Sequence, residues 1–127
     1  MEAHERAVHY YVELSGRCPF REWRDAISDK VTKAAIDARI ARLRGGNFGN
    51  SKPIGAGASE SRIDFGPGYR IYYGVDGIDL ILLGGGTKSS QDADIEEAKG
   101  FWKDYKERKQ NAQKVRLQSR PSGRSKK

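Results

Sequence analysis

Hydrophobic and polar positions along the first third of the chain recur every three to four residues. Two such runs lie between Pro19 and Arg44 and are separated by Ser28-Asp29. This spacing is typical of amphipathic helices, so we expect one short helix from Pro19 and a second over residues 30–44. So tight a connection predicts an antiparallel hairpin. The expected buried stripes are Phe20, Trp23 and Ile27 in the first helix and Ile36, Ile40 and Leu43 in the second.

After residue 50 the period changes to two, which is typical of β-strands. Residues 60–65 and 69–75 alternate between polar and apolar around the turn Gly66-Pro67-Gly68, and Asp76-Gly77 makes the next turn. The run at 79–83 is apolar on both faces, as in a central strand.

Three further segments complete the pattern. Residues 8–14 are rich in β-formers and predict a first strand, and 52–54 predict a short additional one. Gly84-Gly85-Gly86 is expected to loosen the chain before a last helix, which carries Ile95, Ala98, Trp102 and Tyr105 at helical spacing. The predicted order is β-α-α, a three- or four-stranded antiparallel meander, and a C-terminal helix. Helices packed on one face of a small sheet make this an α+β domain.

The charge is concentrated at the end of the chain. Of 127 residues, 24 are basic and 17 acidic, for a net charge of +7. Residues 106–127 hold nine basic residues and one acidic residue, which leaves 1–105 at −1. We therefore expect a domain over 1–105 and a basic tail over 106–127, disordered from Lys114 onward. The tail either contacts nucleic-acid phosphates or stays solvated.

Other features narrow the class of protein. A single cysteine excludes an internal disulfide and a cysteine-built zinc site, and His4 and His9 have no partner at ligand spacing. No apolar run reaches the ~20 residues that span a bilayer, and the start lacks the pattern of a secretory signal. These features predict a soluble, cytoplasmic protein without a metal or cofactor.

Candidate chemistry lies on the polar face of the predicted sheet. If Phe65 pairs with Tyr69 across the turn, then one face carries Arg62, Asp64, Arg70 and Tyr72. Two guanidinium groups on a rigid platform would bind phosphate oxygens. The alternative is a cross-strand ion pair of Arg70 with Asp64 on a solvated face.

A second candidate follows the glycines. Lys88, Ser89 and Ser90 come directly after the central strand, where a lysine and two hydroxyls would hold a phosphate near a helix start. The spacing of a P-loop is absent. The alternative is a flexible connection in which Ser90 or Asp92 caps the last helix.

Three long segments carry a family resemblance: RLRGGNFG, SRIDFGPGYRIYY and GGGTKSSQDADI. With them, the chain from about Pro19 to Tyr105 resembles the addiction-module killer proteins, HigB-like toxins of the RelE/ParE superfamily. The resemblance implies a RelE-like β-α-α-β-β-β(-β) fold with a C-terminal helix. It also implies the toxin of a bacterial type II toxin–antitoxin system, a ribosome-dependent mRNA endoribonuclease that arrests translation. The implied partners are a helix-turn-helix antitoxin, the ribosome with mRNA, and operator DNA through the antitoxin alone.

The resemblance also implies site residues. The catalytic set carried over from the family's motifs is Arg62, Arg70, Lys88 and Asp94, and the expected RNA contacts are Lys52, Tyr72, Ser89 and Ser90. The chain departs from the family pattern after Asp94, where an aromatic residue is replaced by Ile95 and the tyrosine of RelE-type toxins is absent. In this interpretation the two arginines stabilise the phosphorane, Lys88 either binds the phosphate or protonates the leaving group, and Asp94 is the candidate base.

Other functions stay open at this point. The missing tyrosine is compatible with a ParE-like toxin that poisons DNA gyrase without cutting RNA. An inactive, antitoxin-binding relic and an RNA-binding protein that acts through its tail are further alternatives.

Overall fold

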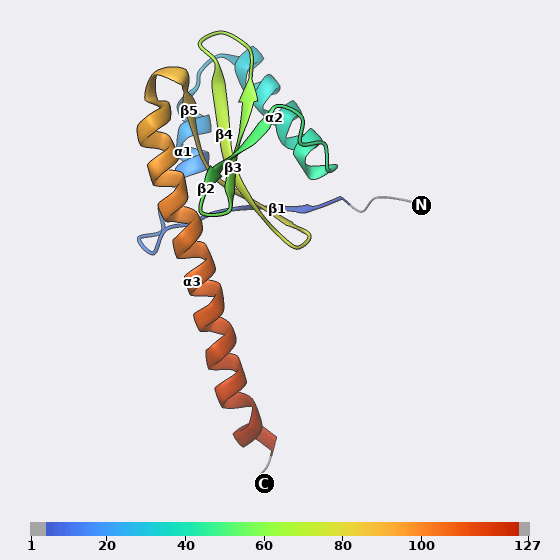
Figure 1. The fold of residues 1–127 in the computed structure, drawn as a ribbon, viewed down its shortest axis with the longest axis vertical. Coiled ribbons are helices and arrows are strands. Elements are labelled where there is room, and N and C mark those ends of the chain that lie inside the picture. Colours follow the sequence, from blue (N-terminus) through green and yellow to red (C-terminus); the bar gives the residue numbers. More distant parts are fainter. Residues whose placement is uncertain (1–4, 125–127) are drawn as a thin grey trace.

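The computed structural model describes residues 5–124, with side chains over residues 5–116. This part of the chain forms one sheet, three α-helices and a 3₁₀ helix. In chain order the elements are β1 (Ala7–Tyr10), α1 (Pro19–Ala26), α2 (Lys30–Arg44), β2 (Ser51–Gly55), β3 (Ala58–Ile63), β4 (Tyr69–Asp76), β5 (Asp79–Thr87), η1 (Lys88–Ser90) and α3 (Gln91–Arg124). The α+β class is therefore confirmed (Figure 1).

The sheet has five strands in the order β1-β5-β4-β3-β2. Strands β2 to β5 form the expected antiparallel meander, and β1 adds a parallel strand beside β5. The first strand is shorter than predicted. After Tyr11 donates its backbone N–H to Leu82, the chain leaves the sheet and turns, with Gly16 donating to Glu13.

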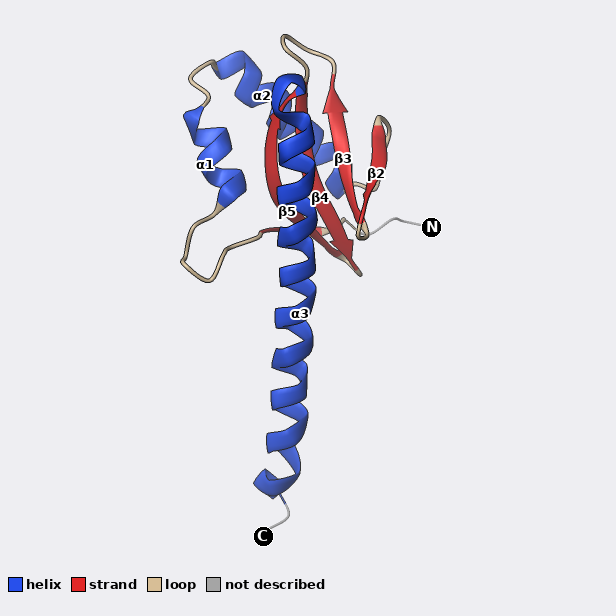
Figure 2. Cartoon of the chain, turned by 60° about the vertical axis from the view of Figure 1, so that its left-hand side comes forward, coloured by secondary structure: helices blue, strands red, loops and turns tan. Residues whose placement is uncertain are grey.

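Helices cover both faces of the sheet, which corrects the expectation of helices on one face only (Figure 2). One core, beneath α1 and α2, is built around Phe20, Ile36 and Ile71, and the other, beneath α3, around Tyr72 and Trp102. Helix α1 packs mainly on β5, and helix α2 packs mainly on β3, rather than the two helices on each other. A salt bridge of 2.7 Å between Arg24 and Asp37 joins them.

The glycine run belongs to β5 and does not loosen the chain as predicted. A Cβ at Gly85 would overlap the ring of Trp23, and a Cβ at Gly86 would overlap the carboxylate of Asp94. The glycines therefore let α1 and α3 approach the same strand from opposite faces. The pairing of β4 with β5 continues past the glycines as far as Thr87.

The pairing of β3 with β4 differs from the predicted register. Ile63, rather than Phe65, lies opposite Tyr69, so Arg62 lies opposite Arg70. A shift of two residues keeps every side chain on its predicted face, because side chains alternate with a period of two.

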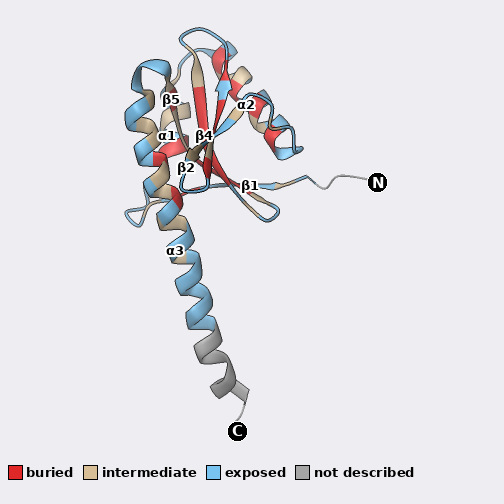
Figure 3. Ribbon diagram, viewed as in Figure 1, coloured by how far each residue is buried: buried red, intermediate tan, exposed pale blue. Residues whose placement is uncertain are grey.

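Helix α3 continues to Arg124, well past the predicted end near Tyr105, so residues 106–124 are helical where a disordered tail was expected. Lysine, arginine, glutamate, glutamine and alanine favour helices, and an ion pair of 2.8 Å between Asp104 and Arg108 adds support. Residues 109–116 are helical although they are exposed (Figure 3). The shortage of apolar residues in this segment therefore keeps it from packing against the sheet but does not keep it from forming a helix. Residues 125–127 lie outside the described part. No helix among the described residues has the length and hydropathy to cross a membrane.

Candidate functional site

Three of the predicted basic residues meet where β3, β4 and η1 come together. Arg62 and Arg70 are direct partners across the β3–β4 pair. A Cβ built on Gly68 would lie 3.3 Å from Nη1 of Arg70 and 3.8 Å from Cβ of Lys88. The β4–β5 hairpin therefore brings Lys88 beside Arg70 from 18 residues further along the chain.

Arg70 is buried beside a carboxylate, whereas the sequence placed it on a solvated or ligand-binding face. Arg70 is 5% exposed, and its Nε lies 3.9 Å from a carboxylate oxygen of Glu60, which is 1% exposed. Nη1 of Arg70 donates to the carbonyl of Gly68 at 2.9 Å. Gln91, at the start of α3, donates to both oxygens of Glu60 at 3.0 and 3.2 Å. Arg70 therefore lies beneath the surface, where the carboxylate of Glu60 balances its charge.

The predicted partner of Arg70 is wrong. Asp64 lies 3.4 Å from Nε of Arg62, and both side chains are largely exposed. Because the register is shifted by two residues, Glu60 is opposite Tyr72 and takes the place beside Arg70 that the prediction gave to Asp64. The sequence contains a signal for Glu60 as a neighbour of Arg70, since Glu60 is two residues before Arg62 and its side chain lies on the same face of the strand.

The remaining basic and hydroxyl residues of the predicted site stay accessible. Among the residues of the predicted site, the exposed ones are Lys52, Arg62, Lys88, Ser89 and Ser90. The ammonium group of Lys52 lies 3.9 Å from Glu60. Exposed cations around a buried, neutral Glu60–Arg70 pair can bind an anionic group without leaving a buried charge unpaired.

Asp94 is held at the junction of η1 and α3. Ser90 donates its hydroxyl to Oδ2 of Asp94 at 2.5 Å. Ser90 also forms a reciprocal cap with Thr87 around η1. The connection after β5 is thus ordered by its own hydroxyls, and the capping role predicted as the alternative for Ser90 belongs to this short helix.

Tyr72 is not accessible in this structure. It is 0% exposed, and its hydroxyl has no hydrogen-bond partner among the described residues. Burial, followed by the negative charges of Glu60 and Asp94, raises the pKa of Tyr72 above its ordinary value. The phenol is therefore neutral at physiological pH and does not serve as a proton acceptor through a phenolate.

Within the described residues, no three histidine, cysteine or acidic side chains gather closely enough to hold a metal ion. The chemistry available to the site is that of exposed cations, hydroxyls and the half-buried carboxylate of Asp94.

The chain is similar to an uncharacterized protein of Haemophilus influenzae strain Rd. The two are 44% identical over 89 residues, which make up 69% of this chain and 90% of the relative. The chain belongs to the same family as that protein. No model of a protein family matches the chain, and no solved structure matches it either.

Proposed function

We propose that the chain is a RelE-like toxin of a bacterial type II toxin–antitoxin system, and that it cuts mRNA on the ribosome. The observation that carries the proposal is the group formed by Arg62, Arg70 and Lys88 near the first turn of α3, which holds Asp94. It joins residues from two separate motifs of the resemblance on one side of the sheet.

The proposed reaction needs no metal. The 2′-hydroxyl of the RNA attacks the adjacent phosphorus and gives its proton to Asp94, while the bond to the 5′-oxygen breaks. Lys88 donates a proton to that departing oxygen. Arg62 contacts the phosphate directly. Arg70, paired with Glu60, supports the β3–β4 surface that presents Arg62. The products are a 2′,3′-cyclic phosphate and a 5′-hydroxyl.

Positioning would supply much of the rate. A carboxylate and a lysine are ordinary proton-transfer groups, so alignment of the messenger by the ribosome is required. Lys52, Ser89 and Ser90 would hold neighbouring phosphates, since they surround the same group in exposed positions. The cognate antitoxin, of the helix-turn-helix type, would cover this surface and alone contact operator DNA. Both partners act in the cytoplasm.

A double substitution at exposed positions tests the proposal. Arg62→Ala with Lys88→Ala removes two cations without opening the core. Arg42→Ala with Lys103→Ala is the matched control, because it removes one arginine and one lysine that are exposed elsewhere. On induced expression, wild type and control should arrest growth and produce new 5′-hydroxyl ends on messengers, detected by primer extension.

The first double variant should lose both effects while keeping its circular dichroism spectrum and melting temperature. Undiminished cleavage by that variant would refute the assignment of these residues.

Poisoning of DNA gyrase is the second candidate function. The burial of Arg70 and Tyr72 under α3 favours it, because two of the expected RNA-contacting groups are not exposed. Growth arrest with intact messengers and with DNA damage would identify this activity.

A further inference from the structure

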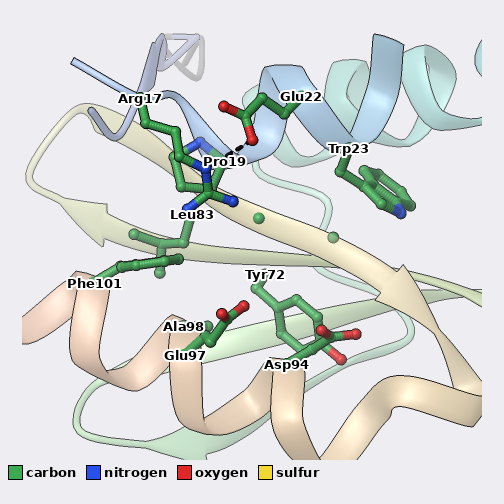
Figure 4. A pocket seen from close by; sticks show the side chains of 12 residues that line it. Arg17, Pro19, Glu22, Trp23, Tyr72, Leu83, Asp94, Glu97, Ala98 and Phe101 are labelled. Carbon is green, nitrogen blue, oxygen red and sulfur yellow. Dashed lines mark hydrogen bonds and ion pairs between the residues drawn. The ribbon is translucent and has the colours of Figure 1, made fainter. Parts of the chain in front are cut away.

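A pocket of about 290 Å³ lies between α1, α3 and the glycine-rich end of β5 (Figure 4). Its lining includes Trp23, Tyr72, Gly84, Glu97 and Phe101. Asp94 and Tyr72 of the predicted site line this pocket, but none of its basic residues does, so a phosphate-binding role does not account for the pocket.

The floor of the pocket offers both space and an unused polar group. A Cβ at Gly84 would meet no atom within 4 Å, whereas one at neighbouring Gly85 would overlap Trp23 on the other face. Tyr72 also lines this floor, and its buried hydroxyl has no hydrogen-bond partner among the described residues. Buried hydroxyl groups are ordinarily hydrogen-bonded, so its free state is consistent with a site for a ligand that donates a hydrogen bond.

The rim of the pocket is acidic. Glu22, Asp94 and Glu97 line it against a single cation, Arg17. That cation is already paired, with Glu22 at 2.8 Å and with Glu13 at 2.6 Å. In contrast, Glu97 makes no hydrogen bond or ion pair with any described residue. The pocket therefore favours a cation and disfavours a phosphate.

The walls of the pocket are aromatic and held in place. Phe101 stacks on Tyr11 with ring centroids 5.0 Å apart, and Trp23 packs on Phe20 at 5.8 Å. Aromatic faces attract cations, and a planar guanidinium stacks on them better than an ammonium group does.

We propose that this pocket binds the guanidinium group of an arginine side chain presented by a partner protein. The guanidinium donates to Glu97 and lies against the aromatic walls. A small movement of the Tyr72 side chain brings its buried oxygen within reach of the same guanidinium. Pairing of β1 with β5 stops at Leu82, and no other described strand lies beside the rest of β5 on that side. A partner's backbone can approach this edge, which favours a peptide over a free metabolite. The inference goes beyond the proposed nuclease and does not depend on it.

Nuclear magnetic resonance of the full chain tests the proposal directly. The two tryptophans, Trp23 and Trp102, give separate indole N–H signals, and only Trp23 lines the pocket. Titration with Nα-acetyl-L-arginine amide should shift the Trp23 signal and leave that of Trp102 in place. A Kd of about 1 mM is expected for a ligand of about 15 non-hydrogen atoms.

Three comparison ligands separate the possible sources of binding. The blocked lysine and agmatine, which carries the guanidinium without a peptide backbone, should each bind at least threefold more weakly than the blocked arginine. Guanosine 5′-monophosphate should not shift Trp23. A response of Trp23 to the nucleotide and not to the blocked arginine would overturn the proposal in favour of an RNA base.

Matched variants locate the site. Glu97→Gln should weaken binding of the blocked arginine about fivefold, whereas Glu96→Gln, one residue earlier on α3 and outside the pocket, should leave it unchanged. Gly84→Ala should weaken binding at least tenfold, because its methyl group occupies the floor. Tyr72→Phe should weaken it about threefold and slightly raise the melting temperature, because it removes an unpaired buried hydroxyl. Wild-type affinity in both Glu97→Gln and Gly84→Ala would refute the site.

Discussion

The contact between β4 and α3 predicts a large penalty for adding a single methyl group. Gly74 lies beneath Trp102, and a Cβ built on it would lie 2.5 to 2.7 Å from three atoms of the indole ring. Ordinary contacts between carbon atoms are about 3.5 to 4.0 Å. The substitution Gly74→Ala therefore requires the indole, and with it the helix, to move by about 1 Å away from the sheet.

The magnitude follows from how Trp102 is packed. The residue is 4% exposed and stacks on Tyr105 with ring centroids 5.1 Å apart, so it has little room to shift. If the core accommodates the methyl group by strain, the free energy of unfolding should fall by about 1–3 kcal/mol. If the indole is expelled, the loss should approach the ~3–5 kcal/mol of removing a buried tryptophan.

Gly84→Ala is the matched control, because it adds the same atom to the neighbouring strand. A Cβ there meets nothing within 4 Å. Since alanine restricts the unfolded chain more than glycine does, the free energy of unfolding should be unchanged or raised by up to about 1 kcal/mol.

Urea unfolding followed by circular dichroism measures both changes, and a double-mutant cycle isolates the contact. In a Trp102→Leu background the offending ring is gone, so the cost of Gly74→Ala should drop below about 0.5 kcal/mol. An equal cost with and without the indole, or no cost in the wild-type background, would refute this account of the packing.

Two further predictions concern charged groups. Arg70→Ala should lower the free energy of unfolding by about 3–5 kcal/mol, because it leaves the buried carboxylate of Glu60 with only the exposed Lys52 as a cation. The exposed Arg62→Ala should cost less than about 1 kcal/mol. Equal urea midpoints for the two variants would contradict this. A hydrogen bond from Lys109 holds the pKa of Asp76 below its ordinary value. The stability that Asp76 contributes is therefore present above its unfolded pKa of about 4 and is lost as the pH falls through the lower folded value. Asp76→Asn should reduce the loss of stability between pH 6 and pH 3 in the same assay, and an unaltered acid limb would exclude this contribution.

The local pattern was sufficient for most elements. The bounds of α2 match the prediction because Asp29 caps it, accepting from the backbone of Val31 and Thr32, and Gly45 ends it. The polar and apolar faces of β3 and β4 were also predicted, since a period of two survives a register shift of two residues.

The candidate site was less predictable, because its character depends on what covers the sheet. Arg70 and Tyr72 were assigned to the correct face, but nothing in their own strand indicates that α3 lies over them. The pocket beside them was missed, although Asp94, Glu97 and Phe101 have the spacing of one helical face.

The sequence by itself determined where most helices and strands form, although not the glycine-rich end of β5 or the length of α3, because caps, turns and hydrophobic periods act within a few residues. Only the tertiary structure decided that glycines at 74, 85 and 86 admit helices to both faces of the sheet. Only the tertiary structure decided that Arg70 is paired with Glu60 beneath the surface. Both results depend on which distant segments approach within a few ångströms, and the period of a single strand carries no information about that distance.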